Sequence, residues 1–89
     1  MKIHETHENI VKRLHRAGGH LASVIEMFEA KRECLDIAQQ MHAVIRALEN
    51  AKTEFIRDHI DHCLEDTLTQ KAGARKASLE EFKEITKYL

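Results

Sequence analysis

Apolar side chains recur every three to four residues through most of this chain, the spacing of one face of an α-helix. They predict a first helix that begins near Thr6 or His7, with the Thr6 hydroxyl capping its first turn. Gly18 and Gly19 interrupt this helix, and we interpret them as a close helix crossing that needs no side chain. The apolar positions alternate between steps of four and three: Ile10, Leu14, Ala17, Leu21, Val24 or Ile25, and Phe28.

A longer stripe predicts a second helix from about Glu33 to about Leu68. Such a helix is about three times the average length, so we expect it to pair with a partner helix. No Gly or Pro interrupts its strict four-three repeat. The stripe consists of Cys34, Ala38, Met41, Ile45, Leu48, Lys52, Phe55, His59 and His62. The residues expected to widen it toward the first helix are Leu35, Ile37, Val44, Ala51 and Ile56.

Two breaks in the pattern separate three helices. Residues 30–33 are predicted to form a short turn that ends the first helix, and residues 69–77 a basic loop. Ser78, followed by Glu81, matches a capping box and predicts the start of a third helix. We therefore expect an all-α protomer of three helices with a long central helix, in a single domain spanning residues 1–89.

Composition narrows the class of protein. The 89 residues include no Pro or Trp and four aromatic side chains, so one chain has a thin core and oligomerisation is favoured. No apolar run reaches the roughly 18 residues of a membrane span, and no secretion signal is recognisable. Two cysteines without such a signal indicate a reduced, cytoplasmic protein. Without a catalytic motif or a phosphate-binding loop, we expect no enzyme and no small-molecule substrate.

The strongest candidate for chemistry lies at residues 58–63, near the end of the second helix. His59 and Cys63 are four residues apart, so they share one helical face and would bind one transition metal. Cys34 precedes them by 25 and 29 residues, offsets that return to within about 20° of the same angle. At about 1.5 Å per residue, however, Cys34 is roughly 38 Å from His59.

One straight helix cannot close this site, whereas an antiparallel copy can. In a two-fold dimer, Cys34 of one protomer would lie beside His59 and Cys63 of the other, at two identical sites. This arrangement predicts a homodimer, with metal or thiol chemistry at both ends of the interface.

Further histidines bear on which metal is bound. His62 is either an additional ligand or a solvated neighbour, and both readings stay open. His4 and His7 are placed on an N-terminal tail that would fold over the site. They would raise the coordination number toward that of Ni²⁺ or Co²⁺, whereas a trigonal Cys/His/Cys set suits Cu⁺.

The first helix also has a basic face. Arg13 and Arg16 are three residues apart and point the same way. Taken alone, this is an ordinary solvated face, because the chain has a net charge of only −1. An oligomer that aligned these faces would present a positive strip to a polyanion.

Three segments together resemble the CsoR/RcnR family of metal-sensing repressors: residues 13–21, 34–44 and 59–63. The resemblance covers about residues 8–68 and implies three-helix protomers that form an antiparallel dimer and then a flat tetramer. It also implies that the metal-free tetramer binds double-stranded operator DNA, and that the bound effector lowers DNA affinity and releases transcription of an efflux or detoxification gene.

By position, the resemblance implies that Cys34, His59 and Cys63 are effector ligands. A supporting glutamate on the third helix would fall at Leu79, next to Glu80 and Glu81. The residues expected to contact DNA are Lys12, Arg13, Arg16, His20, Lys31 and Arg32.

The His-rich N-terminus resembles the nickel/cobalt branch, whereas Glu33 and Asn50 depart from the copper sensors. We therefore expect a repressor that Ni²⁺ or Co²⁺ releases from DNA. The alternatives are a Cu⁺-responsive repressor of the same family, a thiol sensor that uses Cys34 and Cys63, and a metal-binding bundle without a DNA role.

Overall fold

In the computed structural model, three α-helices follow one another along the chain, and residues 2–69 and 72–89 are described. α1 spans Lys2–Glu29, α2 spans Cys34–Thr69, α3 spans Ala72–Ile85, and the short 3₁₀ turn η1 spans Thr86–Tyr88. For residues 2–6, 63, 66–69, 72 and 74, only the backbone is described. No strand occurs in the described ranges. The prediction of an all-α protomer with a long central helix is confirmed.

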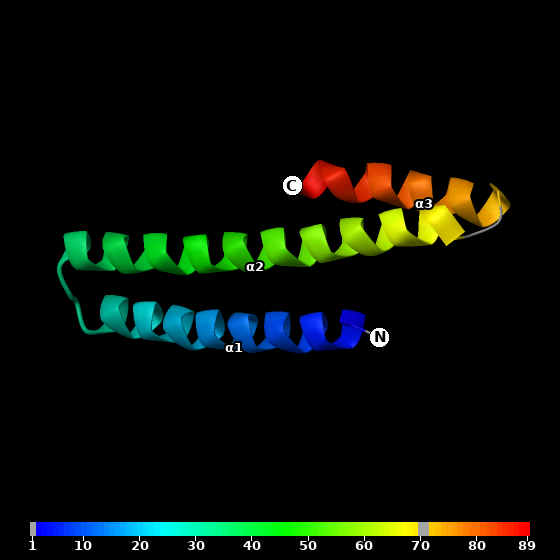
Figure 1. The fold of residues 1–89 in the computed structure, drawn as a ribbon. Helices are drawn as coiled ribbons and strands as arrows, with labels where there is room; N and C mark the ends of the chain where they lie inside the picture. The colour runs from blue at the N-terminus through cyan, green and yellow to red at the C-terminus, as the bar shows by residue number, and fades with distance from the viewer. Residues whose placement is uncertain (1, 70–71) are drawn as a thin grey trace.

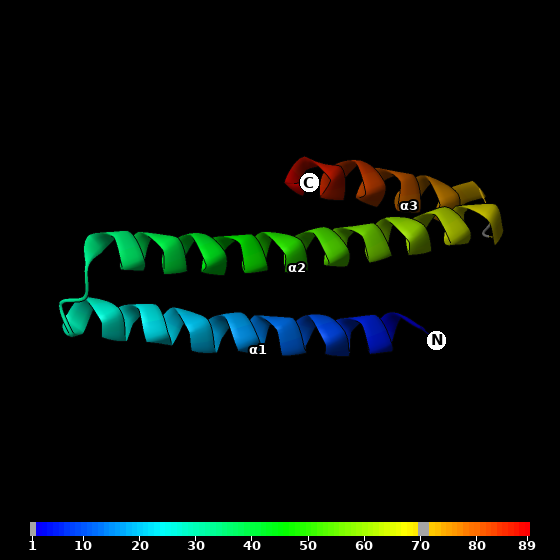
Figure 2. The ribbon, with the colours of Figure 1, turned by 60° about the vertical axis from the view of Figure 1, so that its left-hand side comes forward.

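The three helices form an open, layered arrangement. α1 and α2 lie antiparallel and side by side, and α3 folds back along the C-terminal half of α2, on the side opposite α1 (Figure 1). The turned view shows the same order of layers (Figure 2). The long α2 therefore packs against both of the other helices.

α1 ends in a turn that its own backbone closes. Lys31 has a φ of 55°, the left-handed conformation that is common just after a helix. The N–H of Lys31 donates to the carbonyl of Phe28 at 3.1 Å, and that of Arg32 to the carbonyl of Met27 at 3.0 Å. These bonds satisfy carbonyls that the helix leaves unpaired. The predicted turn at residues 30–33 is confirmed.

The core between α1 and α2 is a narrow seam whose residues recur in steps of seven. Since the helices run antiparallel, this spacing brings Val24 against Ile37 and Val44, with Met27 packed beside them. Seven residues make almost two helical turns, so the seam is one side chain wide. Its buried members are Ile10, Ala17 and Val24 of α1, and Ile37, Val44 and Ala51 of α2.

A second apolar face of the same two helices stays exposed. Its α2 members belong to the stripe that carries Cys34 and His59, whereas the buried α2 residues are among those expected to face the first helix. The ligand-bearing stripe is therefore uncovered in the single chain. The exposed members, each more than a third exposed, are Val11, Leu14, Leu21, Ile25 and Phe28 of α1, and Met41, Ile45, Leu48 and Phe55 of α2.

The dimensions of the chain also indicate an incomplete globule. Its extents are 59 × 24 × 14 Å and its radius of gyration is 18.0 Å, against about 12 Å for a compact chain of this length. The accessible surface is 7100 Å², about 1,700 Å² more than a folded monomer of this mass exposes. That excess is comparable to the surface that one subunit buries in an obligate dimer.

Two boundaries differ from the sequence predictions. α1 begins at Lys2, so Thr6 lies within the helix and the predicted start near Thr6 or His7 is wrong. α3 begins at Ala72, so most of the predicted loop at residues 69–77 is helical and Ser78 does not open the helix. The Ala-rich, basic run before Ser78 has a strong helix propensity, which outweighs the cost of one glycine near the start of the helix.

The glycine pair of α1 does not make the predicted close crossing within the chain. A Cβ atom added at Gly18 or Gly19 would meet nothing within 4 Å in the described structure. α2 therefore does not require glycine at these two positions.

Candidate metal centre and nucleic-acid interface

Cys34 and His59 lie far apart on α2. Cys34 is the first residue of the helix, and its thiol is exposed and outside any disulfide. His59 follows 25 residues later, roughly 38 Å along the axis. Within the described part of the chain, no three His, Cys, Asp or Glu side chains gather as a metal site. The side chain of the third predicted ligand, Cys63, is not among those that the structure describes.

His59 is packed against α3. Its side chain is 23% exposed, and its Nε2 atom lies 3.2 Å from Oε1 of Glu81. This nitrogen is buried and makes no hydrogen bond in the described structure, because the carboxylate is close enough for an ion pair but not suitably aligned. The Glu81 side chain is 63% exposed, so it has room to reorient toward this nitrogen.

Glu81 was not the residue that the sequence placed beside the metal site. The prediction was Leu79, which is 44% exposed. Residues 79 and 81 point about 200° apart on a helix, so they cannot face the same neighbour. Sequence reasoning named Glu81 only as adjacent to the expected position, and the packing of α3 on α2 identifies it.

α1 reaches the same end of α2 through His7. The ring centroids of His7 and Phe55 are 5.8 Å apart, and those of Phe55 and His59 are 6.5 Å apart. His7 is therefore on a helix and not on the predicted tail, and its ring and that of His59 both lie beside Phe55. The side chain of His4 is outside the described part.

Both ring nitrogens of His62 have acidic neighbours on α2. Nε2 lies 3.5 Å from Oδ1 of Asp58, and Nδ1 lies 3.9 Å from Oε2 of Glu65. The His62 side chain is 21% exposed. These contacts favour a supporting neighbour over an additional ligand.

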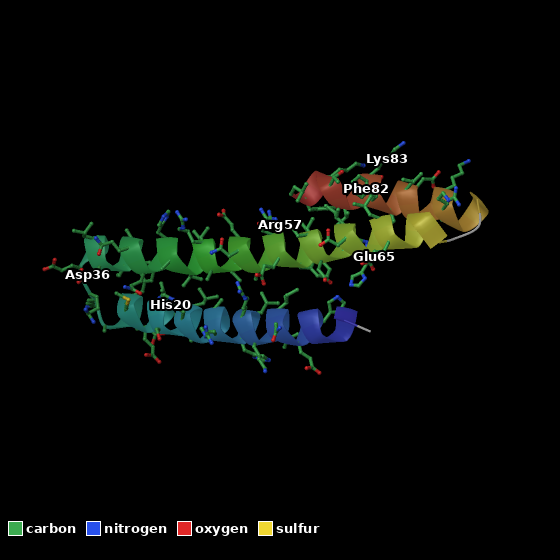
Figure 3. The ribbon with its side chains drawn as sticks, viewed as in Figure 1. His20, Asp36, Arg57, Glu65, Phe82 and Lys83 are labelled. Carbon is green, nitrogen blue, oxygen red and sulfur yellow. The ribbon has the colours of Figure 1, made fainter. Side chains whose placement is uncertain are left out.

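A groove of about 350 Å³, lined by both polar and apolar surface, runs between α1 and α2. At one end, Nη2 of Arg13 lies 3.3 Å from Oε1 of Glu54. At the other, His20 is half-buried between the two helices (Figure 3), and its Nε2–H donates to Oε1 of Gln40 at 2.6 Å. The groove gathers three of the residues expected to contact DNA. Its lining consists of Arg13, Arg16, Ala17, His20, Ala47 and Asn50.

The other expected DNA contacts lie outside this groove. Lys12 is exposed on α1. Lys31 and Arg32 lie at the turn between α1 and α2, where Nη2 of Arg32 is 3.7 Å from Oδ2 of Asp36. Figure 3 shows Asp36 at the end of α2 next to this turn. The structure thus separates a groove cluster from a turn cluster.

Known proteins are similar to this chain in sequence. A family profile described as "Metal-sensitive transcriptional repressor" matches residues 6–88. The copper-sensing transcriptional repressor CsoR of Bacillus subtilis (strain 168) is 34% identical over 82 residues, covering 90% of this chain and 81% of that protein. CsoR of Mycobacterium ulcerans (strain Agy99) is 30% identical over 78 residues, covering 88% of this chain and 65% of that protein.

A solved structure shows the same fold. The nickel-responsive transcriptional regulator InrS has a TM-score of 0.80 at 28% sequence identity, covering 91% of this chain and 89% of that chain. Copper and nickel sensors both occur among the relatives, which supports a transition metal as the effector.

The comparisons confirm the expectation that the protein is not an enzyme, because the family and these relatives are transcriptional regulators. In the described residues, no helix has the length and apolar character to cross a membrane. With the profile matching residues 6–88, the chain belongs to the CsoR/RcnR family of metal-sensitive transcriptional repressors.

Proposed function

We propose that this cytoplasmic protein represses transcription by binding operator DNA in its metal-free form. Ni²⁺ or Co²⁺ would release it by joining Cys34 of one protomer to His59 and Cys63 of its partner. Release would permit transcription of a metal efflux gene. The observation that carries the proposal is that the stripe bearing Cys34 and His59 is the apolar face that a single chain leaves exposed.

A second copy of the chain suits this face because the stripe is symmetric about Leu48. Met41 and Phe55 lie seven residues before and after it, and Cys34 and His62 lie 14 residues before and after it. A two-fold axis at Leu48 would therefore set Cys34 beside residues 59–63 of the partner.

The shape of the face also suits a partner helix. A groove of about 370 Å³, almost entirely apolar, separates Leu14 of α1 from Leu48 and Phe55 of α2. Side chains of the partner would fill it, as knobs fill holes in a four-helix bundle. Two such dimers would then form the tetramer that the family resemblance implies.

The residues present fit a transition metal. Nε2 of His59 faces Glu81, so Nδ1 is the nitrogen left for the metal. An acidic partner on the second ring nitrogen is the usual support for a histidine ligand, because it fixes the orientation of the ring. Thiolate and imidazole donors suit nickel, cobalt and Cu⁺, and would not favour calcium or magnesium.

His7 favours Ni²⁺ or Co²⁺ among these metals. Its ring lies 5.8 Å from Phe55, at the end of α2 where the metal would bind. Ni²⁺ and Co²⁺ accept more ligands than the trigonal Cys/His/Cys set that suits Cu⁺. Cu⁺ sensing by the same three residues is the second candidate, supported by the copper-sensing relatives.

DNA would bind along the groove that contains Arg13, Arg16 and His20. Guanidinium groups pair with phosphate oxygens, and such contacts supply most of the salt-dependent affinity. The same two helices form the groove and the dimer face. Joining two protomers at the ends of α2 would therefore change how their grooves are spaced, and DNA affinity would fall.

The test is a titration of the metal-free protein with Ni²⁺, Co²⁺ and Cu⁺, with binding to its own upstream DNA followed in parallel. We expect Ni²⁺ or Co²⁺ to lower DNA affinity and to produce thiolate-to-metal charge-transfer absorption. Cys34→Ser should lose both responses and keep DNA binding.

Three other outcomes separate the alternatives. Release by Cu⁺ alone would support the copper sensor. Release by an oxidant that survives His59→Asn would support the thiol sensor. If the protein binds metal but no DNA at low salt, it is a metal-binding bundle and the repressor function is wrong.

A further inference from the structure

Arg13, at one end of the groove between α1 and α2, is already paired with a carboxylate. Its Nη2 lies 3.3 Å from Oε1 of Glu54 on α2, and each side chain is 48% exposed. The contact therefore joins two helices at the surface. Exposed ion pairs of this kind are weak, so their members exchange readily with other ions.

The two helices contribute unequal charges to this groove. α1 supplies Arg13 and Arg16, whereas α2 supplies Ala47 and Asn50, which are uncharged. Glu54 follows Asn50 by one helical turn along the same edge of α2. Its carboxylate offsets about half of the positive charge that the two arginines provide.

We propose that Glu54 is an internal competitor for DNA phosphate. In the DNA-free protein, Glu54 is paired with Arg13. This pair must break before the Arg13 guanidinium contacts a phosphate. This inference rests on the proposed DNA-binding function. It assigns to Glu54 the role of limiting how tightly the metal-free repressor holds DNA.

The competition has two measurable consequences. Breaking the pair opposes DNA binding, and the released carboxylate then stays close to the phosphates and repels them. In addition, a protomer whose Arg13 remains on Glu54 makes one phosphate contact fewer, which reduces the salt dependence of binding. Removing the charge of Glu54 should therefore both tighten binding and make it more sensitive to salt.

Glu54→Gln is the informative variant, because the amide keeps an oxygen that can orient Arg13. Fluorescence anisotropy would follow binding of the metal-free full chain to its own upstream DNA at several salt concentrations. We expect binding about two- to five-fold tighter for each contacting protomer. The log–log salt slope should steepen by about one unit or less per contacting protomer.

The matched control is Glu80→Gln, which removes the same charge from an exposed position on α3 that does not line the groove. It should leave affinity and salt slope unchanged. A double-mutant cycle isolates the pair: in an Arg13→Ala background, Glu54→Gln should give a clearly smaller gain, because only the repulsion between the carboxylate and the phosphates is then relieved. Thermal unfolding of each variant checks the fold.

The outcomes separate this inference from the function on which it rests. If wild-type protein binds DNA and Glu54→Gln binds no tighter than Glu80→Gln, the competitor role is wrong and the repressor function stands. An equal gain with and without Arg13 would also overturn it, since the effect would then be general electrostatics. If wild type and variants all fail to bind DNA at low salt, both proposals fail.

Discussion

The two ends of α2 carry the predicted metal ligands in opposite settings. At the N-terminal end, Cys34 is exposed. At the C-terminal end, His59 is 23% exposed, with Glu81 of α3 at 3.2 Å and Phe55 beside its ring. Cys34 at one end is therefore exposed, whereas His59 at the other end is already surrounded by side chains of its own protomer.

This difference is what the proposed site, shared between two chains, would require. In the proposed site, the nearby Glu81 and Phe55 would limit how His59 can turn, which lowers the cost of ordering it when metal binds. The thiol has to reach the other chain, so it cannot be packed within its own. Metal binding and dimer assembly would then be linked, and each would strengthen the other.

The largest expected effect comes from Leu48→Glu, which places a charge in the middle of the exposed apolar face proposed as the dimer interface. Leu48 is 42% exposed in the single chain and lies where the two-fold axis would pass. Two carboxylates would meet there without partners, which costs several kcal/mol (about 3–5). We expect monomers that lose metal binding at both ends, measured by sedimentation and metal titration.

The control for this variant is Leu79→Glu on α3, where the leucine is 44% exposed and belongs to α3 instead of the α1–α2 face. It introduces the same charge at a similar exposure and should leave the dimer intact. A Leu48→Glu protein that remained dimeric with unchanged metal affinity would rule out this face as the interface.

Mixing two defective subunits gives the next largest effect. Cys34→Ser and His59→Asn chains should each fail to bind metal tightly on their own. When they are unfolded and refolded together, a mixed dimer would regain one of its two sites, because intact Cys34 and intact His59 then come from different chains. By random pairing, about a quarter of the wild-type sites should return.

The readout is the charge-transfer absorption of the mixture, compared with the sum of the separate proteins. Cys34→Ser refolded with itself under the same conditions is the control. Recovery no greater than that sum would show that Cys34 and His59 do not meet across the interface.

The sequence was sufficient for the parts of this comparison that depend on helical period. The length of α2 and the common stripe of Cys34 and His59 follow from the repeat of apolar positions. So does the separation of these two residues along the helix, because a straight helix converts residue number directly into distance.

What could not be predicted depends on packing between helices. Glu81 faces His59 because α3 folds back along α2 (Figure 1), and no pattern within one helix encodes that packing. The capping-box match also missed the start of α3, which is Ala72 and not Ser78. The Arg13–Glu54 pair likewise joins long side chains on different helices. Which of them meet depends on helix register and rotamers, and periodicity within one helix does not encode either.

A smaller effect is expected from Glu81→Gln, which changes the neighbour of His59 near the C-terminal end of α2. The amide keeps the shape of the side chain but loses the charge that would hold the Nε2–H of His59. Loss of such a supporting partner typically lowers metal affinity by about 10- to 100-fold. Competition with a chelator of known affinity would measure it.

Glu80→Gln is again the matched control, since it removes the same charge one residue away on an exposed side chain. DNA binding by metal-free Glu81→Gln should be unchanged, because Glu81 does not line the groove. Equal metal affinities for the two variants would show that Glu81 does not support His59.

The smallest effect should come from His62→Asn, which tests whether the crowded end of α2 contains a second histidine ligand. The Nε2 and Nδ1 atoms of His62 lie 3.5 Å from Asp58 and 3.9 Å from Glu65, so binding metal would displace at least one of these contacts. A neighbour that only adjusts the local charge should change metal affinity by less than about five-fold. A loss as large as that of Cys34→Ser, with a shifted charge-transfer band, would instead show that His62 is a ligand. The C-terminal end of α2 would then contribute two histidines to the site.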